Sequence, residues 1–163
     1  MQLTLYTDYS LRVLVYLSMN SNRSATISEI AEFYAISRNH LVKVVHNLSL
    51  KKYINSSRGK GGGLRLADDP SNINLGSVIR DTEPNFHTAD CLNTTTITNC
   101  KIEPICHLKS IFSIATDRFL HTLDEYTIAD IINFKPEEHS EIKLDALMEK
   151  LLQRQTEEDM GDA

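Results

Sequence analysis

Residues 26–66 read TISEIAEFYAISRNHLVKVVHNLSLKKYINSSRGKGGGLRL, and this stretch decides the fold. It opens with TISE, a threonine followed three residues later by a glutamate, which is the pattern of a helix N-terminus. A short turn (YAI) comes next, and Ser37 is placed to cap a second helix over 38–50. Two short helices joined by a tight turn predict a helix-turn-helix motif at about residues 28–51.

The second helix has one apolar and one polar face. Its apolar residues recur at i, i+3, i+4 and i+7, the spacing that buries one side of a helix: Leu41, Val44, Val45 and Leu48. The opposite side presents polar and basic residues, which are Arg38, Asn39, Lys43 and Asn47. A polar outer face in this position is typical of a helix that enters the major groove of DNA.

The hairpin that follows, over 52–67, is expected to be a wing. A strand-like run (KYINSS) leads into the tip RGKGGG, whose glycines permit the positive φ angles of a tight turn, and LRL returns. A phosphate-binding nucleotide loop is the alternative for a glycine run. We discount that alternative because the spacing G-x-x-x-x-G-K-[ST] is missing and no helix pattern follows directly.

The charges are unevenly distributed along the 163 residues. The net charge of −5, taken for the whole chain, argues against a nucleic-acid partner. Residues 1–80, however, contain ten basic and five acidic residues (+5), whereas 81–163 contain seven and seventeen (−10). Within the first half, 38–65 has seven basic residues and no Asp or Glu. A solvated face is the alternative, but such faces usually mix signs, so an anionic partner is favoured.

Composition and motifs argue against several classes of protein. With 41% hydrophobic and 24% charged residues, the chain is globular rather than disordered. Its apolar stretches are far shorter than the roughly 20 residues of a membrane span, and its start lacks the pattern of a secretory signal. An enzyme is disfavoured because no Ser/His/Asp order, paired carboxylates or nucleotide loop stands out.

Helices are expected over most of the remaining chain. A first helix is predicted over 9–19, with Thr7 or Asp8 as its cap. A short helix follows the wing at 74–80. A longer helix of roughly 20 residues begins at Pro104. It has an apolar stripe made of Ile105, Leu108, Phe112, Ala115 and Phe119. Because so small a domain cannot cover this helix, we expect it to pack against a second copy of the chain.

The C-terminal part is predicted to contain two further helices. Thr127-x-x-Asp130 is a capping box for a short helix, and 137–154 has the pattern of an amphipathic helix before an acidic tail. The predicted fold class is mainly α, a winged helix-turn-helix domain with a long dimerisation helix and a cysteine-bearing cluster loop. The chain is divided into a DNA-binding domain (1–80), the cluster loop with the dimerisation helix (81–133), and a C-terminal helix with the tail (134–163).

Three cysteines, Cys91, Cys100 and Cys106, lie in or next to the polar segment 85–103, which shows no periodicity. Their odd number argues against a disulfide framework, and the C-x2–4-C pairs of structural zinc are absent. Three thiolates on a loop without its own core suit an iron–sulfur cluster, which would organise the loop. Unrelated thiols and a thiol redox switch are the alternatives. The candidates for a fourth ligand are His107, His87, Asp90, Glu103 or a residue of another chain.

Several stretches of the chain are similar to a known family. They are LTLYTDYSLRVLVYL at the start, ISRNHLVKVVHNLS in the second helix, RGKGGGLRLA in the wing, IRDTEPNF before the cysteines, and PICHLKSIFSIATDRFLHTLDEYTIADI at their end. In this combination, which covers roughly residues 1–133, the chain resembles the iron–sulfur winged-helix repressors related to IscR. Within that family it is most similar to the nitric-oxide-sensing branch.

The resemblance implies a cytoplasmic bacterial homodimer with one cluster per subunit, [4Fe–4S] favoured and [2Fe–2S] possible. Cys91, Cys100 and Cys106 match the family's cluster cysteines, and Asp8 matches an aspartate contributed by the partner subunit. Such a repressor would bind a palindromic operator in double-stranded DNA and release it when nitric oxide nitrosylates the cluster. The alternatives are a family member that senses iron or cluster supply and, from another class, a small iron–sulfur electron carrier.

In a complex with DNA, base contacts would specify the operator and phosphate contacts would hold the protein on it. The residues expected at base edges in the major groove are Ser37, Arg38, Asn39, His40 and Lys43. The residues expected at phosphates or in the minor groove are Thr26, Ser28, Arg58 and Lys60.

Overall fold

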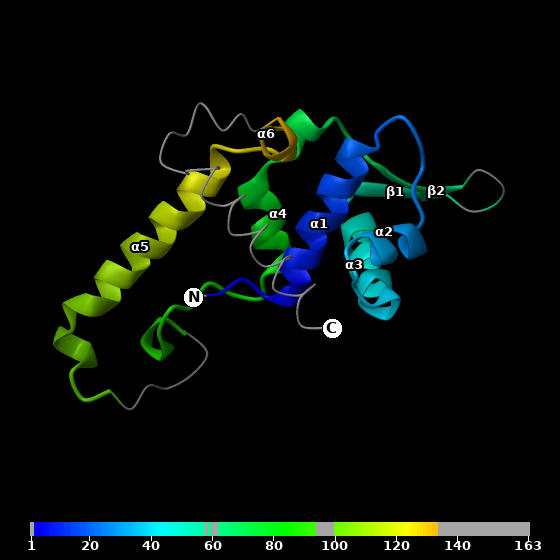
Figure 1. Ribbon diagram of the computed structural model, residues 1–163. Coiled ribbons are helices and arrows are strands. Elements are labelled where there is room, and N and C mark those ends of the chain that lie inside the picture. The colour runs from blue at the N-terminus through cyan, green and yellow to red at the C-terminus, as the bar shows by residue number, and fades with distance from the viewer. Residues whose placement is uncertain (1, 58, 60–61, 94–99, 134–163) are drawn as a thin grey trace, which may run out of the picture. The chain divides into compact units, whose positions relative to one another are not determined.

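The computed structural model describes residues 2–57, 59, 62–93 and 100–133 (Figure 1). It is mainly helical with one two-stranded antiparallel sheet, which confirms the fold class expected from the sequence. No helix of the described residues is long and apolar enough to cross a membrane. The elements in chain order are α1 (Leu5–Met19), α2 (Ile27–Phe33), α3 (Arg38–Leu50), β1 (Ile54–Ser57), β2 (Gly63–Leu66), the 3-10 turn η1 (Pro70–Asn72), α4 (Leu75–Thr82), the turns η2 (Asp90–Leu92) and η3 (Glu103–Ile105), α5 (His107–Asp124) and α6 (Ile128–Ile132).

The helix-turn-helix starts at Thr26, where the sequence predicted the beginning of a helix, and this start is a capping box. The Thr26 hydroxyl accepts a hydrogen bond from the Glu29 N–H (3.2 Å), and the Glu29 carboxylate accepts one from the Thr26 N–H (3.4 Å). Arg23 and Tyr16 also donate to this carboxylate, and their hydrogen bonds lower the pKa of Glu29 to about 2. Because Tyr16 belongs to α1, the start of α2 is fixed to α1.

Helix α3 starts at Arg38 and Ser37 occupies its N-cap position, both as predicted. Within the described part of the chain, however, the Ser37 hydroxyl makes no capping hydrogen bond. The first N–H groups of α3 therefore lack this side-chain acceptor.

Helix α1 begins at Leu5, four residues earlier than predicted, and its cap is Thr4 rather than Thr7 or Asp8. The Thr4 hydroxyl accepts a hydrogen bond from the Thr7 N–H (3.3 Å). The Thr4 N–H in turn donates to the carboxylate of Glu83 (2.6 Å), which follows α4 in the chain. Thr7 is buried and Asp8 lies in the first turn of the helix. A residue 79 positions away thus helps to fix the start of α1, and local sequence patterns do not register such a contact.

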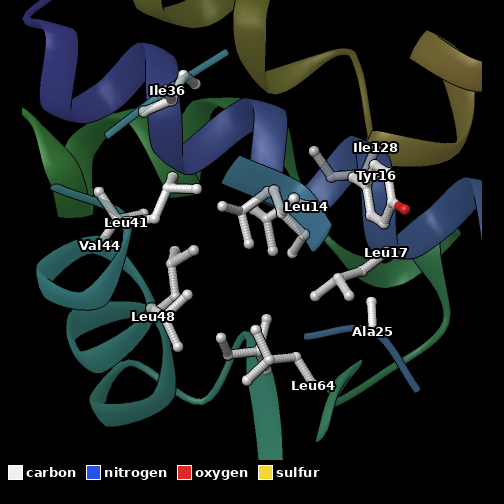
Figure 2. Packing of buried hydrophobic residues seen from close by; sticks show 14 of the residues in the cluster. Leu14, Tyr16, Leu17, Ala25, Ile36, Leu41, Val44, Leu48, Leu64 and Ile128 are labelled. Carbon is white, nitrogen blue, oxygen red and sulfur yellow. The ribbon is translucent and has the colours of Figure 1, made fainter. Parts of the chain in front are cut away.

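The hydrophobic core is centred on the contact between α1 and α3 (Figure 2). Leu14 and Leu17 of α1 are almost completely buried there, together with Leu64 of the wing and Ile128 of α6. Burial of each such side chain contributes roughly 2 kcal/mol to folding. The predicted apolar face of α3 is at most 6% exposed at each of its members, Leu41, Val44, Val45 and Leu48. One side of α3 is therefore fixed in the core, and the other side faces outward.

The wing is joined to the helix-turn-helix by backbone hydrogen bonds. Its strands pair antiparallel, with Ile54 opposite Leu66. Leu64 of β2 also exchanges two backbone hydrogen bonds (3.1 and 2.8 Å) with Ala25, the residue before the capping threonine of α2. Gly63 permits this approach, because a Cβ atom at residue 63 would lie 2.8 Å from the Ala25 carbonyl oxygen. The position of the wing therefore depends on the absence of a side chain at Gly63.

The long helix begins three residues later than predicted. Pro104 belongs to the turn η3, Cys106 follows with an extended backbone (φ −82°, ψ 109°), and α5 starts at His107. The extended conformation of Cys106 interrupts the helical hydrogen bonds, so α5 has 18 residues. Beyond α5, the Thr127 N–H donates to the Asp130 carboxylate (2.7 Å) at the start of α6, as the capping pattern predicted.

Some of the predictions concern segments that the structure does not describe. The helix expected over 137–154 and the acidic tail lie outside the described residues. The described residues up to Ile132 belong to one compact unit. Helix α4 continues past residue 80, where the first domain boundary was expected. The predicted division of the chain stays a prediction.

Replacement of Gly63 by alanine should destabilise the fold more than the same replacement of Gly59. Both glycines have positive φ angles (+150° and +97°), which strains an L side chain, but a Cβ atom has open space only at Gly59. We expect a loss of about 1 kcal/mol in unfolding free energy for Gly59→Ala and of about 3 kcal/mol for Gly63→Ala, because the clash with Ala25 adds to the strain. Urea unfolding measures both values, and equal losses would contradict the role assigned to Gly63.

Candidate DNA interface and cysteine loop

Helix α3 presents a polar surface on the side opposite the core. The residues predicted to contact bases are all exposed on or beside it: Ser37, Arg38, Asn39, His40 and Lys43. Thr26 and Ser28, predicted to contact phosphates, are exposed at the start of α2. Because the other side of α3 is buried, this polar surface has a fixed orientation relative to the core.

A hydrogen bond joins two of the predicted DNA-contacting residues. The Arg38 Nε–H donates to the Ser28 hydroxyl oxygen (3.2 Å), so the start of α2 and the start of α3 lie side by side. This bond restrains the long arginine side chain while leaving its terminal N–H groups for other acceptors. The uncapped N-terminus of α3 lies beside Arg38, and helix N-termini attract anions.

Two tyrosines of α1 support the polar surface of α3, and the sequence interpretation missed both. The Tyr9 ring stacks on the His40 ring, with 6.2 Å between centroids and 25° between planes. The Tyr6 hydroxyl donates to the backbone oxygen of Lys43 (3.5 Å). Tyr6 and Tyr9 are spaced i, i+3 and so share a face of α1, which is the signal that could have identified them. The predicted cluster ligand Asp8 directly precedes Tyr9.

Arg65 is a basic residue of the wing that sequence reasoning did not select as a DNA contact. Arg58 and Lys60, the predicted contacts at its tip, lie outside the described residues, while Gly59 between them has the positive φ expected of the turn. Arg65 is exposed on β2 and donates to the Ser24 hydroxyl (2.9 Å). Its place in the acid-free segment is the signal that could have identified it.

The charge count of the acid-free segment needs one correction. The Lys51 ammonium group pairs with the Asp81 carboxylate of α4 (2.8 Å), so this charge is compensated from outside the segment. The Tyr53 hydroxyl donates to the other carboxylate oxygen (2.7 Å). These hydrogen bonds, the one from Lys51 foremost, lower the pKa of Asp81, which keeps the pair ionised at neutral pH. Spacing along the sequence does not reveal a pair separated by 30 residues.

The three cysteines lie where they were predicted, on the segment between α4 and α5, and their thiols are free. Cys91 belongs to η2 and is half-buried, Cys100 is exposed, and Cys106 is half-buried directly before α5. None of the described residues from 83 to 106 is buried, so these thiols are not part of an apolar core. Free thiols outside the core fit an iron–sulfur cluster in donor chemistry.

The structure does not bring the predicted ligands together. Among the described residues, no three His, Cys, Asp or Glu side chains form a group that could hold a metal ion. The Asp8 carboxylate pairs with Arg12 (2.8 Å), and the Glu103 carboxylate pairs with Lys109 (3.0 Å). The three remaining candidates for a fourth ligand are exposed, namely His87, Asp90 and His107.

Helix α5 has an apolar face that the described residues do not cover. None of its 18 residues is buried within the described part of the chain. Phe112 and Phe119 of the predicted stripe are half-buried, whereas Leu108 is 50% exposed. Ile111 (57%) and Ile114 (59%) are exposed beside Leu108 and were not part of the predicted stripe. The helix thus has apolar residues on two faces, more than contact with one neighbour requires.

The capped α2, the half-buried α3 and the wing attached through Ala25 define a winged helix-turn-helix protein of the transcription-regulator class. Residues 3–134 match the family model Rrf2, described as an iron-dependent transcriptional regulator. The chain belongs to the Rrf2 family. This confirms the resemblance inferred from the sequence, and the regulators of this family are not enzymes, as expected.

Individual relatives support the same assignment. The chain is 47% identical over 133 residues to the HTH-type transcriptional regulator NsrR of Bacillus licheniformis, covering 81% of this chain and 92% of the relative. A putative transcriptional regulator from Listeria innocua has a similar fold (TM-score 0.68, 20% identity, 83% of this chain and 88% of that chain). IscR from T. potens is also similar (TM-score 0.63, 21% identity, 87% and 92%).

Replacement of Tyr9 by leucine should weaken binding to operator DNA, because it removes the ring that supports His40. An aromatic pair contributes about 0.5–1.5 kcal/mol, so we expect a loss of roughly 2- to 10-fold in affinity. Fluorescence anisotropy with a duplex selected from a random library by the wild-type protein measures this change. Tyr9→Phe keeps the ring and is the matched control. Equal losses in both variants would contradict a supporting role of the stacked ring.

Proposed function

We propose that this protein is a homodimeric, cytoplasmic transcriptional repressor that binds a palindromic operator and releases it in response to nitric oxide. The observation that supports DNA binding is the polar surface of α3, held outward by a buried opposite face. The residues that would contact base edges in the major groove are Ser37, Arg38, Asn39, His40 and Lys43. Membership of a family of transcriptional regulators supports this reading.

The phosphate contacts would surround this surface. The exposed Thr26 and Ser28 and the uncapped N-terminus of α3 offer hydrogen-bond donors to phosphate oxygens. The exposed Arg65 on β2 would add positive charge, as would Arg58 and Lys60, the contacts predicted from the sequence. The acidic residues of the chain are concentrated after residue 80, so attraction to DNA would favour the α3 side of the molecule.

The exposed apolar face of α5 supports the proposed homodimer. Leu108, Ile111 and Ile114 are each at least half exposed, and a second copy of the same helix offers a matching apolar surface. A two-fold dimer would place two α3 helices in successive major grooves, about 34 Å apart, which requires a palindromic operator.

The proposed sensor is an iron–sulfur cluster held by Cys91, Cys100, Cys106 and Asp8 of the partner subunit, with [4Fe–4S] favoured and [2Fe–2S] possible. When bound, such a cluster supplies iron that reacts with nitric oxide. In each subunit, Asp8 lies in the first turn of α1, directly before Tyr9, which contacts His40. A change in the position of this turn would therefore be passed to α3. The nitric-oxide reading rests on the resemblance of the sequence to the nitric-oxide-sensing branch of the family.

A regulator that responds to iron or cluster supply is the second candidate. The family description, an iron-dependent transcriptional regulator, favours it. Separate titrations of the DNA-bound protein with nitric oxide and with an iron chelator distinguish the two candidate signals. The true signal should release the DNA at a lower molar ratio of reagent to protein than the other reagent does. A small electron carrier is disfavoured, because it would not require the outward polar surface of α3.

Operator binding should depend strongly on salt. If each dimer neutralises about six phosphates, the logarithm of the association constant should fall with the logarithm of salt concentration with a slope of about −5. Anisotropy titrations at several salt concentrations measure the slope. Arg38→Gln should weaken binding, whereas Arg118→Gln on α5 is a control that removes the same charge elsewhere. A slope near zero would contradict the proposed DNA-binding function.

Removal of one cysteine should abolish both the cluster and the repressor activity. Cys100→Ala, purified without oxygen, should lack visible absorbance and bound iron and sulfide, because three ligands are required for assembly. Its operator affinity should fall together with the absorbance, and circular dichroism should show an intact helical fold. Ser110→Ala, an exposed residue near the loop, is the control. Full operator binding by the cluster-free variant would contradict the proposed coupling.

A further inference from the structure

The end of α5 is joined to α4 by a paired hydrogen bond. The Arg80 guanidinium, in the last turn of α4, donates two hydrogen bonds to the carboxylate of Asp124, the last residue of α5 (2.5 and 2.7 Å). Two parallel bonds between planar groups fix a direction as well as a distance. The hydrogen bonds from Arg80 lower the pKa of Asp124, so the pair is ionised at neutral pH.

Gly76 makes room for this pair. It lies one helical turn before Arg80 and is buried in the contact between α4 and α5. A Cβ atom at residue 76 would lie 2.0 Å from Asp124 Oδ1 and 2.9 Å from an Arg80 nitrogen. Glycine within a helix costs about 1 kcal/mol relative to alanine, so its presence here is explained by the close approach of the carboxylate.

Asp124 is held from a second side as well. The Asn74 side-chain amide, at the N-cap of α4, donates to the backbone oxygen of Asp124 (2.7 Å). Asn74 and Arg80 are about 9 Å apart along α4, since a helix rises 1.5 Å per residue. Both contacts end on Asp124, one on its backbone oxygen and one on its carboxylate, so together they fix this residue beside α4. The chain after α5 is held as well, because the Leu75 N–H donates to the Tyr126 oxygen (2.9 Å).

This contact lies between the two surfaces on which the proposed function depends. Helix α4 packs against α1 and contributes Val78 to the core that fixes α3, the proposed DNA-reading helix. Helix α5 carries Leu108, Ile111 and Ile114, the proposed dimer surface, toward its other end. A small rotation where α5 meets α4 would therefore be amplified along α5 into a change in the distance between the two α3 helices of a dimer.

We propose that Gly76, Arg80 and Asp124 form a joint that sets the angle between α5 and the winged helix-turn-helix, and thereby the half-site spacing of the operator. This inference rests on the proposed function. The three residues are positioning residues, because they lie away from the surface proposed to touch DNA. The ion pair is partly exposed (41% and 36%) and so adds little to the stability of the fold, which suits an orienting role.

The test uses the full-length protein, with its cluster, and a set of DNA duplexes. Each duplex carries two copies of a half-site selected by the wild-type protein, with the spacer lengthened or shortened by one or two base pairs, and one further duplex carries a single half-site. The variants are Gly76→Ala, Arg80→Gln and Asp124→Asn, with Arg118→Gln as the control on the same helix. Light scattering verifies that each variant is a dimer.

The wild-type protein and Arg118→Gln should prefer one spacer sharply. Arg80→Gln and Asp124→Asn should lose at least about fivefold of that preference, with unchanged affinity for the single half-site. The double variant Arg80→Gln/Asp124→Asn should equal either single variant, because both remove the same pair. Gly76→Ala should behave alike, and if it fails to fold, the two charge variants still decide the question.

The result that would overturn the inference is an unchanged spacer preference in both charge variants. The inference would also be overturned if the charge variants lost as much affinity for the single half-site as for the best two-site duplex. The residues would then act on α3 itself and not on the spacing. Failure of the wild-type protein to bind any duplex would instead overturn the proposed function. Wild-type binding without any spacer preference would overturn the dimeric arrangement on which the joint depends.

Discussion

The packing of α3 on α1 is the contact on which the rest of the structure depends. Leu41, Val44, Val45 and Leu48 enter a core that Leu14 and Leu17 of α1 complete, and this burial fixes which face of α3 is outward. A rotation of α3 about its axis would expose leucine and bury Arg38 without a partner, at a cost of several kcal/mol. The orientation of the proposed DNA-reading surface is therefore a consequence of hydrophobic burial. Polar contacts such as the hydrogen bond from Arg38 to Ser28 then restrain individual side chains on this surface.

Helix α1 has more than a structural role in this arrangement. The first turn of α1 contains Asp8, and Tyr9, the residue after it, stacks on His40. The N-cap residue Thr4 donates a hydrogen bond to Glu83, which directly precedes the cysteine-bearing segment. One helix thus contacts the core, the reading surface and the chain segment proposed to hold the cluster. The proposed mechanism needs no long-range signal path. Asp8, the proposed cluster ligand, directly precedes Tyr9, whose ring stacks on His40 of α3. The coupling is then a property of the position of α1.

Local patterns were sufficient to predict the elements but not the contacts between them. The capping box at Thr26, the apolar face of α3 and the glycine turn of the wing were predictable because each depends on residues a few positions apart. The hydrogen bond from Thr4 to Glu83, the pair of Lys51 with Asp81 and the pair of Arg80 with Asp124 were not, because their partners lie 30 to 79 residues apart in the sequence. The three cysteines were singled out by their residue type and position and Asp8 by the family resemblance, and the described residues do not bring these four side chains together.

The glycines show how function can be encoded by the absence of a side chain. Gly63 and Gly76 both occupy positions where a Cβ atom would meet another element, at the Ala25 carbonyl and at the Asp124 carboxylate. In the first case the close approach fixes the wing to the helix-turn-helix, and in the second it fixes α5 to α4. Hydrophobic burial alone would tolerate small shifts at both places, since it is non-directional. Hydrogen bonds made at close approach remove that freedom, and in the proposed function they would give the dimer the defined angles that two half-sites demand.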